Sequence, residues 1–300
     1  MKNLSIIALC LISCLAFTAS NLVAQEEIPQ GIITKHSWDK SKLYPGTTRD
    51  YWVYVPAQYK ASDPACVMVI QDGHAYIDQE GPVYVPALFD KLIHNGEMPV
   101  TIGIFINPGK TQGPPEEIQR RVEYATMNDT YARFLVEEII PEVGKSYTLF
   151  DDASGRAICG SSAGGICSFT AAWERPDVFS KVISFIGGFA GVPGGGEYPA
   201  LIRETKGNPK PIRVFLQSTE NDLNWTMGDF RLGNMQMASA LEFAKYDYRF
   251  ELGPGGHDLE HAGSILPEIL QWLWRDFPSV KGAENYAVTE SEEQVVPVVP

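Results

Sequence analysis

The sequence predicts an α/β protein in which a mainly parallel central sheet carries helices on both faces. Three observations predict it. Strand-like and helix-like segments alternate along the chain, which is typical of parallel sheets built from strand–helix–strand units. The strand-like runs are apolar and bounded by turn residues, as in strands buried on both faces. The chain of 300 residues is long enough for one sizeable domain and short for two.

The elements that define this expectation are spread over the chain. An N-terminal β region includes His36. The expected strands are residues 66–71, 156–160, 211–217 and 246–252, and the expected helices are residues 86–93, 130–143, 162–173, 235–244 and 263–274. Neither an internal repeat nor a Gly/Ser linker interrupts this order, so we expect one domain over residues 25–278.

Residues 160–164 fit the pattern G-x-S-x-G and place Ser162 in the position of a nucleophile. A strand-like run precedes the pattern and a helix-like run follows it. This strand–turn–helix context is the one that a nucleophile elbow requires. Gly160 and Gly164 let the strand and the helix pass close together around a strained serine backbone. The alternative is a Gly/Ser loop that merely caps a helix.

A nucleophilic serine needs a base, and among the five histidines His257 is the candidate. It follows the strand-like run 246–252 and comes after the serine and an acid in chain order, as in this class of triad. The glycines before it free the backbone to aim an imidazole across the sheet edge.

The acid is expected after the preceding strand, where Glu220 and Asp222 both lie in the loop. An acid here would accept a hydrogen bond from the second ring nitrogen of His257 and fix its tautomer. We favour Asp222 because it lies further into the loop, with Glu220 as the alternative. Asp258 is a weaker choice, because sequence neighbours seldom reach that geometry.

An oxyanion hole needs two backbone N–H groups. One is expected from Ala163, the residue after the nucleophile. The other should come from the turn after the strand 66–71, and there either Gly73 or His74 could supply it.

At this point the chain resembles the "putative esterase" family of the α/β-hydrolases, which includes enterochelin esterases, S-formylglutathione hydrolase, and feruloyl and acetylxylan esterases. The residues that carry the resemblance span about 44–277 and are, in family order, Tyr44–Thr47, Tyr54–Pro56, Gln71–Gly73, Ile104–Gly109, Arg120–Tyr124, Gly160–Gly165, Glu220–Asn224, Gly256-His257 and Trp272–Trp274. The resemblance implies the α/β-hydrolase fold and a triad of Ser162, Asp222 and His257. It is nearest to secreted enterochelin-esterase-like proteins. Ala125 departs from the family pattern, in which an aspartate is expected after Glu-Tyr.

The same resemblance implies substrate-binding roles for Arg120, Glu123, Tyr124 and Trp225. Tyr124, Trp225 and His74 follow family motifs on loops and offer flat faces to an aryl group. Arg120, with Arg121, is the cation that a tri-anionic ferric catecholate would need, because the formal net charge is −13. A neutral feruloyl or acetyl ester meets no such barrier, so both substrate classes stay open.

The acidic composition excludes nucleic acid and anionic membranes as good partners. The expected partner is a small-molecule or oligosaccharide ester, with no cofactor or metal. Two other functions are weighed. His257-Asp-Leu-Glu-His261 matches the zinc pattern H-x-x-E-H, whose histidines must share one helix face. A non-catalytic binding module is the second, although the chain retains a candidate for every triad position.

The termini are expected to lie outside the folded domain. Lys2 and an apolar run over residues 6–17 predict a signal peptide over residues 1–24, and hence a secreted or periplasmic protein without stable membrane insertion. Cys14 lies in a lipoprotein-like box and offers lipidation as the alternative. Residues 279–300 are expected to form an acidic, flexible tail.

Without the signal peptide three cysteines remain, and they are expected to be small buried hydrophobic residues and not a disulfide framework. They are Cys66, Cys159 and Cys167.

Overall fold

A computed structural model of the protein describes residues 27–283. The expected signal peptide, Cys14 within it, and residues 284–300 of the expected tail lie outside the described residues.

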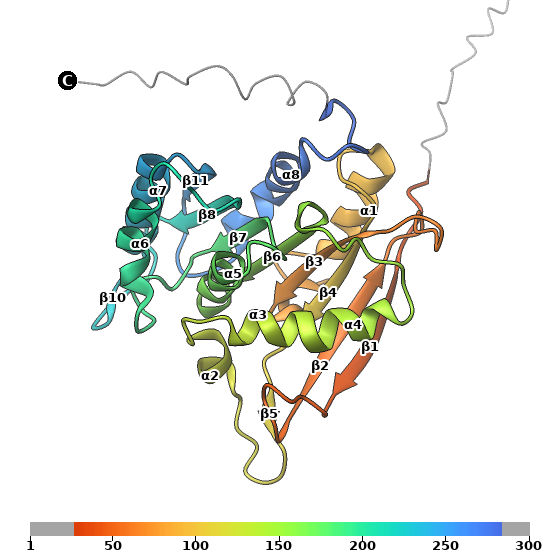
Figure 1. Cartoon of the computed structure of the whole chain (residues 1–300), viewed down its shortest axis with the longest axis horizontal. Helices are drawn as coiled ribbons and strands as arrows, with labels where there is room; N and C mark the ends of the chain where they lie inside the picture. Colours follow the sequence, from red (N-terminus) through yellow and green to blue (C-terminus); the bar gives the residue numbers. More distant parts are fainter. Residues whose placement is uncertain (1–26, 284–300) are drawn as a thin grey trace, which may run out of the picture.

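The central feature is a nine-stranded sheet in which the strand order is β1-β2-β4-β3-β6-β7-β8-β11, with β5 paired to β2 (Figure 1). All pairings from β4 to β11 are parallel, whereas β1, β2 and β5 pair in antiparallel fashion. The predicted, mainly parallel sheet is confirmed. The strands are β1 (Ile32–Trp38), β2 (Thr47–Val55), β3 (Cys66–Gln71), β4 (Thr101–Ile106), β5 (Lys110–Thr111), β6 (Arg156–Ser161), β7 (Lys181–Phe185), β8 (Arg213–Thr219) and β11 (Asp247–Gly253). A separate short hairpin joins β9 (Asn224–Trp225) to β10 (Gly228–Asp229).

The helices lie on both faces of the sheet, as predicted (Figure 1). They are α1 (Val85–Asn95), α2 (Arg120–Tyr124), α3 (Thr130–Phe134), α4 (Ile140–Gly144), α5 (Ala163–Glu174), α6 (Tyr198–Glu204), α7 (Phe230–Ala244) and α8 (Glu260–Trp274). One π-helical turn, Leu135–Ile139, joins α3 to α4, so the expected helix over residues 130–143 is continuous. Three short 3₁₀ turns complete the set, at Gly73–Tyr76, Ala153–Gly155 and Gly195–Glu197.

Side-chain alternation along β3 builds two cores, one on each face of the sheet. Val67 and Val69 pack with α3, α5 and α7, and their neighbours Met68 and Ile70 pack with α1 and α8. Because both faces are covered, the strand is apolar throughout, which is why its sequence shows no alternation.

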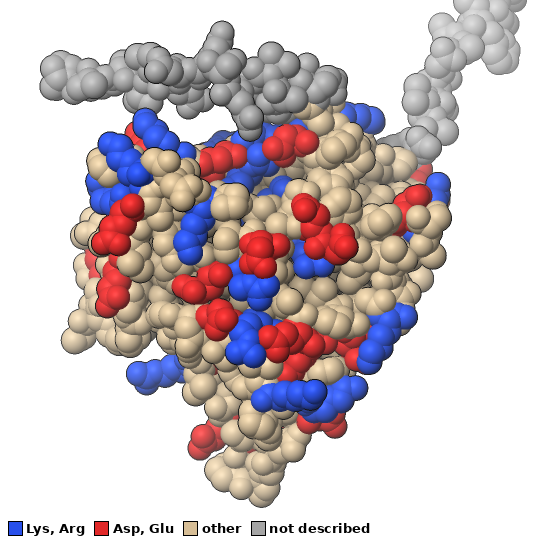
Figure 2. Space-filling view, in the orientation of Figure 1, with Lys and Arg blue, Asp and Glu red and all other residues tan. Residues whose placement is uncertain are grey.

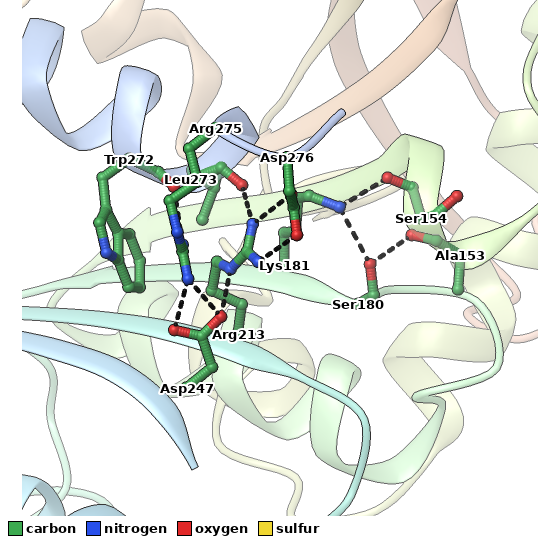
Figure 3. A network of polar contacts seen from close by, with 10 residues as sticks. All are labelled: Ala153, Ser154, Ser180, Lys181, Arg213, Asp247, Trp272, Leu273, Arg275 and Asp276. Atoms are coloured by element: carbon green, nitrogen blue, oxygen red, sulfur yellow. Dashed lines mark hydrogen bonds and ion pairs between the residues drawn. The ribbon is translucent and has the colours of Figure 1, made fainter. Parts of the chain in front are cut away.

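The amino ends of β7, β8 and β11 meet the end of α8 in a polar network (Figure 3). Arg213 holds Asp276 with two bonds of 2.8 and 2.6 Å, and its Nε donates to Asp247 at 2.6 Å. Lys181 donates to the Ser154 carbonyl at 2.6 Å. These contacts fasten α8 to the edge of the sheet opposite the strands' carboxyl ends.

Two helices begin well before their expected ranges: α8 begins at Glu260, three residues early, and α7 differs most. α7 begins at Phe230, five residues before the predicted start, because Asp229 caps it by accepting from the Leu232 N–H at 2.9 Å. Gly233 and Asn234 are poor helix formers and hid this first turn. Tertiary contacts override that propensity: Asn234 is fully buried and its amide donates to the Gly187 carbonyl at 2.9 Å.

Acidic and basic side chains are interspersed on the face of the molecule that Figure 2 shows. Within the stretch from α3 to α4, Arg133 Nε lies 2.8 Å from Glu137 Oε1. Among residues 27–283, none of the helices combines the length and the apolar character that crossing a membrane requires.

Candidate active site

Four parallel strands carry the predicted site residues to one edge of the sheet. β3 is followed by Gly73, β6 by Ser162, β8 by Asp222 and β11 by His257. Because the carboxyl ends of parallel strands meet at one edge, residues far apart in the sequence converge there.

Ser162 lies between β6 and α5 in a strained backbone conformation, with φ 58° and ψ −120°. Its N–H donates to the Phe185 carbonyl at 2.9 Å, which holds the turn against β7. A Cβ on Gly160 would lie 2.4 Å from the Gly164 carbonyl oxygen, so only glycine fits where strand and helix cross. This is the strand–turn–helix geometry expected from the sequence.

Ser162, His257 and Asp222 form one chain of hydrogen bonds. His257 Nε2 lies 2.9 Å from Ser162 Oγ, and His257 Nδ1 lies 2.6 Å from Asp222 Oδ1. An ionised carboxylate can only accept, so Nδ1 carries the proton and Nε2 is left to accept from the serine hydroxyl. The arrangement can therefore move a proton from Ser162 to His257.

Asp222 is held in place for this contact. Its side chain has no exposed surface, and its two oxygens accept from Ser218 Oγ at 2.9 Å and the Leu223 N–H at 2.8 Å. The competing acids lie elsewhere: Glu220 is exposed, and Asp258 accepts from the Gly256 and Glu260 N–H groups before α8.

Two aromatic residues lie next to the histidine in series: Trp225, which the sequence suggested, and Phe230, which it did not. The Phe230 ring packs edge-on against His257 at 5.3 Å, and Trp225 packs edge-on against Phe230 at 5.9 Å. Trp225 is 54% exposed on the β9–β10 hairpin, whereas Phe230 is buried. Phe230 carries no motif, and its position follows from the early start of α7.

The turn after β3 carries Gly73 and His74, the two residues expected to supply the second N–H group of an oxyanion hole. Gly73 packs so tightly that a Cβ there would lie 2.3 Å from the Phe105 carbonyl carbon. The alternative, His74, is exposed, and its N–H donates to Asn107 Oδ1 at 3.2 Å, so that group already has a partner.

Arg120 is not a free cation. Its Nε and Nη2 donate to the two oxygens of Asp72 at 2.9 and 2.7 Å. Burial by itself would lower the pKa of Arg120, but the hydrogen bonds and charge of Asp72 raise it above the ordinary value. Asp72 belongs to the Gln-Asp-Gly motif, but the motif did not predict a role for its side chain.

The substrate-binding role predicted for Glu123 and Tyr124 is wrong. Neither side chain has any exposed surface, so neither can contact a substrate. Glu123 is clamped by Arg49 with bonds of 2.6 and 2.9 Å, and the Tyr124 hydroxyl accepts from the Asp72 N–H at 3.2 Å. Burial raises the pKa of Glu123, and Arg49 opposes the rise.

The H-x-x-E-H pattern does not form the geometry that it suggested. α8 begins at Glu260, so His257 lies before the helix and does not share a face with His261. Both ring nitrogens of His257 are engaged by Ser162 and Asp222.

The three cysteines of the described chain are free and buried, as predicted: Cys66, Cys159 and Cys167. Burial raises the pKa of the Cys66 thiol to about 12.

Comparisons with known proteins identify the family of the chain. A family model described as "Putative esterase" matches residues 44–273. The protein YjcH of Bacillus subtilis (strain 168) is 24% identical over 228 residues, which are 73% of this chain and 88% of that protein.

Two solved structures show the same fold. An enterobactin esterase of Shigella flexneri, solved in the presence of enterobactin, has a TM-score of 0.64 at 19% identity; the match covers 82% of this chain and 61% of that one. A ferulic acid esterase of Anaeromyces mucronatus has a TM-score of 0.63 at 17% identity, over 87% of this chain and 94% of that one. The chain therefore spans about three fifths of the enterobactin esterase, and the predicted α/β-hydrolase fold is confirmed.

Proposed function

Because the chain belongs to the "putative esterase" family, we propose that it cleaves carboxylic esters through a Ser162–His257–Asp222 triad and a covalent acyl-enzyme. The observation that carries this proposal is the unbroken chain of hydrogen bonds, 2.9 Å from Ser162 Oγ to His257 Nε2 and 2.6 Å from His257 Nδ1 to Asp222. A module that only binds would have no need of this geometry.

In the first half-reaction Ser162 Oγ attacks the ester carbonyl while His257 Nε2 takes its proton. The carbonyl oxygen becomes an oxyanion. When the C–O bond to the alcohol breaks, His257 returns the proton to the leaving alkoxide and the acyl group stays on Ser162.

In the second half-reaction a water molecule replaces the alcohol. His257 removes a proton from the water, the resulting oxygen attacks the acyl carbon, and the proton returns to Ser162 Oγ as the carboxylic acid leaves. Asp222 keeps His257 in the tautomer that both steps need and stabilises the imidazolium that forms in each.

The oxyanion is assigned to two backbone N–H groups, those of Ala163 and Gly73. Ala163 is the first residue of α5, so its N–H lies at a helix N-terminus, where the free N–H groups and the helix dipole favour negative charge. Gly73 is preferred over His74, whose N–H is engaged by Asn107.

For the substrate, we propose a neutral ester with an aryl or acetyl acyl group as the first candidate and a ferric catecholate as the second. Trp225 offers an exposed flat face and packs on Phe230, which in turn packs on His257; such a face suits an aromatic ring. The charge of Arg120 is already balanced by the Asp72 carboxylate, which makes it a weaker site for a tri-anion. The enterobactin class remains the second candidate, because solved relatives of both classes share the fold.

A panel of esters tests the substrate class: p-nitrophenyl acetate and butyrate, methyl ferulate, acetylated xylan, and enterobactin with and without iron. We expect the kcat/KM of methyl ferulate or of the acetyl esters to be the highest in the panel. Efficient cleavage of ferric enterobactin with none of methyl ferulate would overturn the substrate proposal, and no turnover of any ester would overturn the triad.

We also propose that the chain is exported after cleavage near Ala24, on the sequence pattern of residues 1–24. N-terminal sequencing of protein secreted by an expression host tests it. A mature chain that starts near residue 25 is expected, a lipid-modified Cys14 would support the lipoprotein alternative, and a retained Met1 would contradict both.

A further inference from the structure

The turn that carries Gly73 is held in an unusual backbone conformation. Asp72, directly before it, has φ 53° and ψ 43°, in the left-handed region that residues with a Cβ adopt only at a free-energy cost. A Cβ on Gly73 would lie 2.5 Å from the Ile106 nitrogen, so the turn is pressed against β4 on its other side. A strained conformation persists where its surroundings enforce it.

α2 supplies the contacts that enforce it. The Asp72 N–H donates to the Tyr124 hydroxyl at 3.2 Å, and its carboxylate accepts two bonds from Arg120. The guanidinium carbon lies 5.3 Å from the centre of the Tyr124 ring, in a cation–π contact. The Asp72 side chain is 12% exposed, so this charged pair is partly desolvated and geometrically specific.

The same pair also reaches the strand that carries the nucleophile. Arg120 Nη2 lies 3.4 Å from the Ser161 carbonyl oxygen. A Cβ on Gly164 would lie 3.1 Å from Asp72 Oδ2, so the carboxylate packs against the first turn of α5. The Asp72–Arg120 pair thus touches both segments that carry the proposed oxyanion donors, the turn with Gly73 and the helix start with Ala163.

We propose that the Asp72–Arg120 pair is a positioning device that sets the Gly73 N–H relative to the Ala163 N–H. The proposal rests on the proposed esterase mechanism. The pair does not touch the substrate: it fixes the backbone that does. Backbone donors act on an oxyanion only within a narrow range of distance, so a small relaxation of the Asp72 turn weakens one of the two bonds.

The test uses Asp72→Asn, which keeps the shape of the side chain but removes its charge, and Arg120→Lys, which keeps the charge but removes the two parallel bonds. Removing one oxyanion donor outright costs about 100- to 1,000-fold in kcat. A displaced donor should cost less, so each variant is expected to lose about 10- to 100-fold in kcat on p-nitrophenyl acetate, with KM nearly unchanged.

Binding of phenylboronic acid gives a readout that a loss of stability does not move. Its tetrahedral adduct on the serine places an oxygen where the oxyanion forms, so its Ki should rise by a factor similar to the fall in kcat. The double variant should be little worse than either single one, because the two residues act as a unit.

The matched control is Arg213→Lys at the opposite edge of the sheet, where Arg213 and Asp276 form the same kind of two-bond pair (Figure 3). It should lower the melting temperature while kcat and the boronic acid Ki stay within about twofold of wild type. The contrast separates positioning from general stability.

Three results would overturn the positioning role: kcat unchanged in both variants, additive losses in the double variant, or a raised KM with kcat intact, which would make Arg120 a substrate ligand. The activities of wild type and Ser162→Ala test the proposed esterase mechanism separately. If wild type cleaves the ester and Ser162→Ala does not, a normal Asp72→Asn contradicts the positioning role alone.

Discussion

At the scale of single residues, the position of Ser162 depends on neighbouring glycines, because they have no Cβ atom. Gly160 faces the backbone of Gly164, and Gly165 faces Ser184 Oγ, at distances of 2.4 and 2.6 Å from where a Cβ would stand. Because a backbone carbonyl cannot move aside as a flexible side chain can, the elbow tolerates no added methyl group at Gly160.

Gly160→Ala is therefore expected to destabilise the protein by about 3 kcal/mol, at the upper end for overpacking of a core. Gly196→Ala is the matched control, since an added Cβ there meets nothing within 4 Å. Urea unfolding measures both. Equal free energies of unfolding for the two variants would contradict the steric account of the elbow.

Asp222→Asn should keep the fold and lower kcat by about 1,000- to 10,000-fold, because the amide can present an N–H to His257 and impose the wrong tautomer. Glu220→Gln changes an exposed side chain and should be mild. Steady-state kinetics on p-nitrophenyl acetate compares them. The reverse ranking would move the acid to Glu220, and two mild effects would indicate a Ser–His dyad.

At the scale of elements, the β9–β10 hairpin places an exposed aromatic face beside the catalytic edge. Trp225→Ala should raise KM for methyl ferulate about tenfold, roughly the value of one aromatic contact, and change p-nitrophenyl acetate little. Phe243→Ala is the control, because Phe243 is also exposed, at 41%, but lies near the far end of α7. Equal effects of the two variants on methyl ferulate would contradict a substrate role for the hairpin.

The amino end of β7 contains a buried charge that the catalytic mechanism does not use. Burial, reinforced by the nearby Arg213, lowers the pKa of Lys181 from 10.5 to about 8. The folded protein therefore loses this proton near pH 8, whereas the unfolded chain keeps it until pH 10.5. Because the unfolded chain binds more protons in this window, Lys181 makes the fold more stable as pH rises from 8 towards 10.5.

The measurement is the free energy of unfolding of wild type and Lys181→Met at several pH values from 7 to 9.5. As pH rises, the free energy of unfolding of wild type should increase by about 1–2 kcal/mol relative to that of Lys181→Met. The comparison cancels the buried thiols and tyrosines, which both proteins share. A difference that is independent of pH would contradict the burial of a charged Lys181.

At the scale of the whole molecule, the parallel sheet explains why so much could be predicted from the sequence. The expected strand over residues 66–71 matches β3, and the expected helix over residues 162–173 matches α5 to within one residue at each end. Each lies beside a turn of characteristic composition, and topology then carries the ends of parallel strands to one edge. The G-x-S-x-G motif, the ends of the expected strands and the chain order could thus indicate candidates for serine, acid and histidine, with Glu220 left as the alternative acid.

The partners of charged side chains could not be predicted in the same way. The substrate roles assigned to Arg120 and Glu123 rested on motif membership, but ion pairing is decided by long-range packing: Arg120 meets Asp72 across 48 positions and Glu123 meets Arg49 across 74. Polar motifs can serve the scaffold as well as the substrate. Phe230 was missed for a related reason, because tertiary contacts extend α7 beyond its propensity.

The central claim is that Ser162 forms a covalent acyl-enzyme. The most direct test treats the protein with p-nitrophenyl acetate at low pH, or with a fluorophosphonate, and locates the adduct by peptide mass spectrometry. We expect one adduct, on Ser162, that is absent in His257→Ala treated for the same time and in Ser162→Ala. An unmodified Ser162 in an enzyme that turns over the ester, or full activity in Ser162→Ala, would contradict the account.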